Sequence, residues 1–159
     1  MTTSVLDKLR DDILPKHYRK NLQGKVDTDC LLFKKGPYVA LAMPFARVSD
    51  GDYGNQHAKA IVRGALTCIP FFFEKGLFLI YYGPKDKWGH QWTRFTVDKT
   101  ALRPVILQSI HFIDPQTGEN ENSRTHWGPL KFGFCGKLIE DLATLGKSIS
   151  RNKVVPRTS

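Results

Sequence analysis

Two clusters of large apolar side chains near the middle of the chain constrain its fold most strongly. Residues Ile69 to Phe73 and Leu77 to Tyr82 are separated only by Glu74-Lys75-Gly76, and both are rich in aromatic and branched side chains. Continuous apolar runs of this kind are typical of strands buried on both faces. The two runs therefore predict a hairpin of central strands that forms the core of a sheet.

Hydrophobic periodicity predicts the elements around this hairpin. Apolar residues recur at helical spacing in some segments and alternate with polar residues in others. We therefore expect an α+β fold with a sheet of about six to eight largely antiparallel strands, one helix before the sheet, one inserted and one after it. Helices are expected over about 4–14, 58–66 and 137–147, and further strands over 26–33, 38–48, 91–97, 104–113 and 130–135. The strands over 26–33 and 38–48 are expected to form a hairpin across a turn at residues 34–37.

The end of the chain differs in composition from the rest. Residues 147–159 contain Lys147, Arg151, Lys153 and Arg157 but no acidic side chain and few aliphatic ones. Such a segment is typical of a solvated terminus. We therefore predict one domain over 1–146 and a basic, flexible tail over 147–159.

Positive charge is distributed evenly along the chain. The 159 residues include 24 Lys and Arg against 15 Asp and Glu, which gives a net charge of +9, and segments 1–36, 37–100 and 101–159 each have the same excess of basic side chains. The folded body itself is therefore expected to be cationic and to attract polyanions. Nucleic acid is the expected partner, with an anionic membrane surface and further copies of the chain as alternatives.

The sequence contains no catalytic or cofactor motif. The three cysteines are far apart, the five histidines do not show zinc-ligand spacing, and no signal peptide or membrane-spanning apolar run is present. We therefore expect a non-enzymatic protein without metal or cofactor, located inside the cell in the cytoplasm or nucleus.

A basic and aromatic run at residues 85–94 is the strongest functional signal. It interleaves cationic side chains with two tryptophans, as base-stacking platforms in a basic groove require. Weaker clusters of the same kind lie near residues 124–127 and 16–20. The predicted function is binding of single-stranded RNA or DNA with low sequence specificity. The predicted contact residues are Lys85, Lys87, Trp88, His90, Trp92, Arg94, Arg124, Trp127, Lys16, Tyr18, Arg19 and Lys20. For Trp88 and Trp92, the competing interpretation is that their rings cover the core.

The sequence is also compatible with two alternative functions. Asp27 and Asp29 are separated by one residue on a predicted strand, so they would face the same side and are candidate ligands for a metal ion in a divergent nuclease. The solvated face of an edge strand has the same pattern. The other alternative is a small basic structural protein that assembles on an anionic membrane, as viral matrix proteins do; it is based on size, charge and β content.

Overall fold

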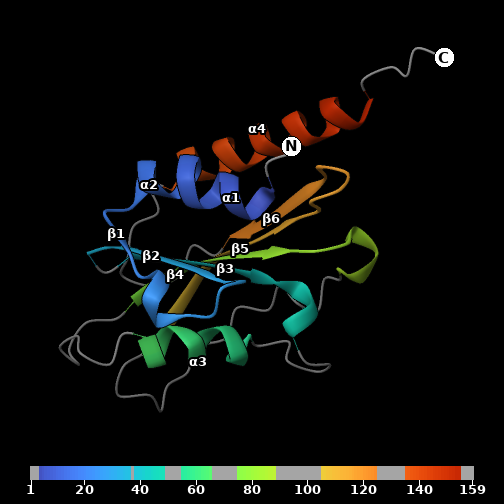
Figure 1. Cartoon of the computed structure of the whole chain (residues 1–159). Helices are drawn as coiled ribbons and strands as arrows, with labels where there is room; N and C mark the ends of the chain where they lie inside the picture. Colours follow the sequence, from blue (N-terminus) through green and yellow to red (C-terminus); the bar gives the residue numbers. More distant parts are fainter. Residues whose placement is uncertain are drawn as a thin grey trace.

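A six-stranded sheet lies between helices on its two faces (Figure 1). The computed structural model describes residues 4–36, 38–48, 55–65, 75–88, 105–124 and 135–154. The strands follow the chain order across the sheet. They are β1 (Lys20–Asn21), β2 (Leu31–Lys35), β3 (Tyr38–Pro44), β4 (Lys75–Tyr82), β5 (Val105–Ile113) and β6 (Asn120–Arg124). The helices are α1 (Val5–Lys8), α2 (Leu14–His17), α3 (Gln56–Ala65) and α4 (Cys135–Val154), with a π-helical turn η1 (Leu9–Ile13) and 3-10 turns η2 (Gln23–Lys25), η3 (Phe45–Arg47) and η4 (Lys85–Lys87).

The sheet is mixed, so the prediction of a largely antiparallel sheet is wrong. Strands β2 and β3 form the expected antiparallel hairpin, and β5 pairs antiparallel with β6. Strand β4, however, pairs parallel with β3 on one side and with β5 on the other. Both hydrogen-bonding edges of β4 are therefore occupied by β3 and β5. Residues 69–73, the other strand of the predicted central hairpin, lie outside the described residues. The chain passes through α3 between β3 and β4, as parallel pairing requires.

The two faces of the sheet bury two separate apolar cores. In β3, Val39, Leu41 and Met43 belong to the core beneath α3, whereas Ala40 and Ala42 belong to the core beneath α1, α2 and α4. This alternation is the period of two expected for a strand. Because both faces of the sheet are covered, side chains on both sides of the central strands are buried, which explains their continuous apolar sequence. The fold is α+β, as predicted.

The helical N-terminal segment is longer than the predicted 4–14. Ser4 caps it, because its hydroxyl accepts a hydrogen bond from the backbone N–H of Asp7 at 3.1 Å. The segment continues through Pro15 to His17. Directly before Pro15, the N–H of Leu14 donates to the carbonyl of Leu9, five residues earlier, which makes this a π-helical turn. The wider turn therefore precedes a proline, which has no backbone N–H to donate.

Helix α4 extends beyond both predicted limits. Cys135 begins the helix instead of ending a strand, and residues 147–154 are helical where a flexible tail was expected. The reason is that Leu138, Leu142, Leu145 and Ile149 continue one apolar stripe, and all four pack against the core beneath α1, α2 and α4. The predicted strand over 91–97 and residues 130–134 lie outside the described residues.

Candidate functional site

The pairing of β1 with β2 joins two basic segments of the sequence. Lys20 lies directly opposite Lys34, and the backbone N–H of Arg19 donates to the carbonyl of Lys34 at 3.0 Å. Lys16, near the end of the helical segment, lies four residues before Lys20, and Lys35 ends β2 directly after Lys34. We call these five residues, Lys16, Arg19, Lys20, Lys34 and Lys35, the basic edge.

None of the five cations of the basic edge forms an ion pair with a carboxylate of the described residues. Four of them are exposed and Lys34 is half-buried. Like charges directly opposite each other on neighbouring strands destabilise a sheet. The Lys20 and Lys34 pair therefore has an electrostatic cost that a bound anion would relieve.

Tyr18 and His17 anchor this segment to the body of the protein. Tyr18 is only 4% exposed and belongs to the core beneath α4, so the structure does not support its predicted role as an exposed base-stacking ring. The imidazole Nε2 of His17 lies 2.7 Å from a carboxylate oxygen of Asp141 on α4. These contacts hold α2 and β1 in place and so fix the positions of Lys16, Arg19 and Lys20.

The run at 85–94 is described only as far as Trp88. The Trp88 ring packs against the core beneath α3, with its centroid 5.4 Å from that of Phe112. The indole nitrogen is buried. In the structure, the Trp88 ring therefore covers the core, which is the competing interpretation of this residue.

The cations beside Trp88 are exposed on η4. The ammonium of Lys85 pairs with Glu119 at 3.2 Å, and the backbone N–H of Lys85 donates to the carboxylate of Asp114 at 3.0 Å. Lys87 is exposed. The remaining predicted contact residues His90, Trp92, Arg94 and Trp127, and the side chain of Arg124, lie outside the described part of the chain.

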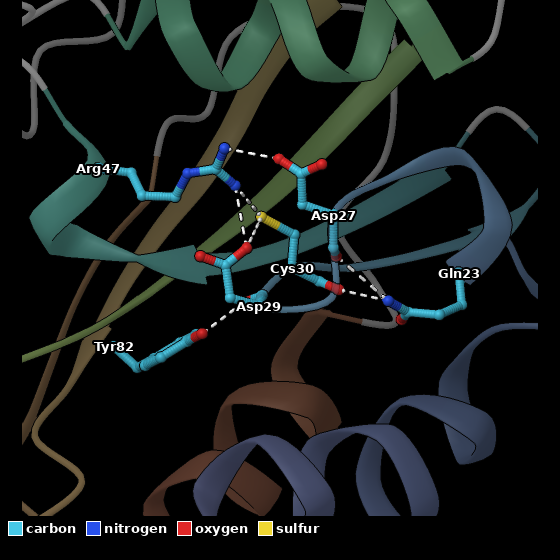
Figure 2. Close-up of polar contacts among 6 residues, drawn as sticks. All are labelled: Gln23, Asp27, Asp29, Cys30, Arg47 and Tyr82. Carbon is cyan, nitrogen blue, oxygen red and sulfur yellow. Dashed lines mark hydrogen bonds and ion pairs between the residues drawn. The ribbon is translucent and has the colours of Figure 1, made fainter.

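Asp27 and Asp29 lie in the loop before β2 rather than on the predicted strand. Their carboxylates flank the guanidinium of Arg47, which follows β3 (Figure 2). Arg47 donates from Nη2 to Asp27 at 2.7 Å and from Nη1 to Asp29 at 3.0 Å. The two carboxylates thus hold a guanidinium, and the described residues contain no group of three His, Cys, Asp or Glu that would hold a metal ion.

Two further side chains complete this cluster. Arg47 Nη1 also lies 3.0 Å from the sulfur of Cys30, and the hydroxyl of Tyr82 donates to the backbone carbonyl of Asp29. Burial, together with the charge of Asp29, raises the pKa of Cys30 to about 11 and that of Tyr82 to about 12. Both groups are therefore protonated at neutral pH, so neither is an activated nucleophile.

A cavity of about 190 Å³ opens beside Arg47. Its walls are the loop that carries Asp27, the turn η3 and one side of α3. Arg47 was not predicted from the sequence, because it lies 18 residues from Asp29 and 20 from Asp27 and no local motif connects them. The lining residues are Lys25, Val26, Asp27, Cys30, Arg47, Ala60, Ile61, Gly64 and Ala65.

Comparison of the chain with protein-family models, curated proteins and solved structures finds no match. Within the described ranges, no helix has the length and apolar character needed to cross a membrane. The function is therefore inferred from the geometry of the basic edge and of the cavity.

Proposed function

We propose that this protein binds nucleic acid without sequence preference, through contacts between the basic edge and backbone phosphates. The observation that carries the proposal is the Lys20 and Lys34 pair, two cations held directly opposite each other beside three more and without a carboxylate partner in the described residues. Phosphate contacts from Lys and Arg supply most of the affinity of sequence-independent binding.

Backbone contacts explain this binding better than base stacking does. Tyr18 is buried, and Trp88 packs on Phe112. Lys20 and Lys34, by contrast, lie opposite each other on adjacent strands, which are about 4.8 Å apart, so both side chains reach the phosphate backbone of one bound strand. The proposal includes a preference for single strands, which stacking of bases on Trp92 or Trp127 would supply. An intracellular location fits a free, buried Cys30 thiol and belongs to the same proposal.

The test compares variants that remove lysine charges from different places. The double variant Lys20→Ala/Lys34→Ala removes the opposed pair, and Lys8→Ala removes an exposed lysine that pairs with Asp12 at 3.3 Å. Fluorescence anisotropy with a labelled oligonucleotide at 0.1 M salt measures the affinity. We expect about a fivefold loss for each lysine removed from the basic edge, as follows from a slope of about 0.7 per phosphate on a single strand.

The Lys8→Ala control is expected to bind like the wild type. Equal losses in Lys8→Ala and in each single variant, Lys20→Ala or Lys34→Ala, would show that net charge rather than the basic edge determines binding. Vesicles containing phosphatidylserine form a second arm of the experiment. The vesicles and unlabelled oligonucleotide are each used to displace the labelled oligonucleotide. If the vesicles do so at a lower phosphate concentration than the unlabelled oligonucleotide, the membrane alternative replaces this proposal.

A further inference from the structure

The cavity beside Arg47 has an apolar wall and a polar wall. Ala60, Ile61 and Ala65 of α3 form the apolar wall. Gly64 leaves this wall open, because a Cβ added there would meet no atom within 4 Å. Arg47 and Asp27 form the polar wall, below α3 in Figure 2. A concave apolar surface with a few convergent polar groups is typical of a small-ligand site.

Arg47 has hydrogen-bond donors to spare. A guanidinium carries five N–H groups, and the bonds to Asp27, Asp29 and Cys30 engage at most three of them. The Nε–H and one Nη2–H make no hydrogen bond with any described residue. Because the two carboxylates and the sulfur fix the guanidinium in place, these donors are held ready for a ligand.

Asp27 supplies an acceptor next to these donors. One of its carboxylate oxygens accepts from Arg47, and the other accepts no hydrogen bond from the described residues. The positive charges of Lys25 and Arg47 balance the negative charges of Asp27 and Asp29, so the local charge is zero. A neutral ligand with an acceptor next to a donor therefore matches the polar wall better than an ion does.

The size of the cavity restricts the ligand to one ring system. A volume of about 190 Å³ is below the roughly 300–1,000 Å³ of pockets for drug-sized ligands. Nucleobases are flat and neutral, and they carry a carbonyl or ring nitrogen next to an N–H group on one edge. Such an edge accepts from Arg47 and donates to Asp27 while the ring lies against α3.

We propose that this cavity binds one unpaired nucleobase of a nucleic acid whose phosphates contact the basic edge, an inference that rests on the proposed function. Cys30 and Lys34 are four residues apart along one extended segment, which places the cavity about 13 Å from the opposed lysines. Lys34 and Leu32 point to the same face of the sheet, the face that α3 covers. A single strand therefore reaches both places without crossing the sheet.

The test fills the cavity without removing a contact. Gly64→Leu places a large side chain in the open space, and a leucine in a helix is favoured over glycine, so the fold is retained. Gly136→Leu is the matched control, because Gly136 also lies in a helix, α4, and a Cβ added there would likewise meet no atom within 4 Å. Each protein is titrated with a labelled single-stranded oligonucleotide, with the same backbone made abasic, and with free nucleosides.

We expect the wild type and Gly136→Leu to bind the intact oligonucleotide about tenfold more tightly than the abasic one. Gly64→Leu should lose this difference but bind the abasic strand like the wild type. Equal binding of intact and abasic strands by the wild type would overturn the base site and leave the phosphate contacts standing. Binding of free nucleosides without any oligonucleotide binding would overturn both proposals, and the ligand would then be a free nucleoside.

Discussion

Replacing Trp88 separates a structural role of this residue from a role in binding. Trp88 is half-buried against the core beneath α3 and packs on Phe112. Removal of a fully buried aromatic side chain costs about 3–5 kcal/mol. Because Trp88 is partly exposed, we expect Trp88→Ala to lower the free energy of unfolding by about 2 kcal/mol, which corresponds to a fall of roughly 4–8 °C in Tm for a domain of this size.

Trp88→Phe is the matched variant for this prediction. The buried indole nitrogen has no hydrogen-bond partner in the described residues, so phenylalanine keeps the ring contact and loses no hydrogen bond. We expect it to cost less than about 1 kcal/mol. Urea denaturation followed by circular dichroism measures both variants, and anisotropy measures their affinity for an oligonucleotide. A Trp88→Ala protein of normal stability whose affinity falls about tenfold would refute the core assignment and identify Trp88 as a stacking ring.

Three further predictions follow from local geometry. Gly118→Ala is expected to lower the free energy of unfolding, measured by urea denaturation, by more than about 2 kcal/mol, because Gly118 has φ of 78° and an added Cβ would clash with the carbonyl oxygen of Gly146. The control Gly24→Ala places its Cβ in open space and is expected to be nearly neutral. Iodoacetamide at pH 8 is expected to label Cys30 only in denaturant, since burial raises its pKa to about 11; peptide mapping that finds native Cys30 labelled would contradict this. Burial lowers the pKa of His111 to about 4, below the unfolded value of about 6.5, so the folded state is destabilised as pH falls from 6.5 toward 4. We expect the free energy of unfolding of the wild type to fall by about 2 kcal/mol between pH 7 and pH 5 through this group, and His111→Phe to lack this fall.

Local elements of the fold were predictable from the sequence, but the order of parallel strands was not. Alternating side chains and a turn at Gly36, whose φ of 58° favours glycine, are local signals, and they identified the hairpin of β2 and β3. The apolar run of β4 is compatible with either parallel or antiparallel neighbours. Its partners depend on contacts between segments far apart in the chain, which no local pattern records.

The candidate site was predictable to a similar degree. Lys16, Arg19 and Lys20 were found because they lie together in the sequence, whereas Lys34 and Lys35 join them only through strand pairing. In the cluster around Arg47, the sequence pointed to Asp27 and Asp29 only as candidate metal ligands, and no local pattern indicated Arg47. For the C-terminal helix, the position of Ile149, four residues after Leu145 on the same apolar stripe, is the sequence signal that could have predicted its continuation beyond residue 147.

The salt dependence of oligonucleotide binding tests the basic edge most directly. Each phosphate neutralised on a single strand contributes about 0.7 to the slope of log K against log salt concentration. We predict that the slope for Lys20→Ala/Lys34→Ala is shallower than that of the wild type by about 1.4, while the slope for Lys8→Ala is unchanged. Equal slopes for the wild type and the double variant would contradict the claim that the opposed lysines contact phosphates.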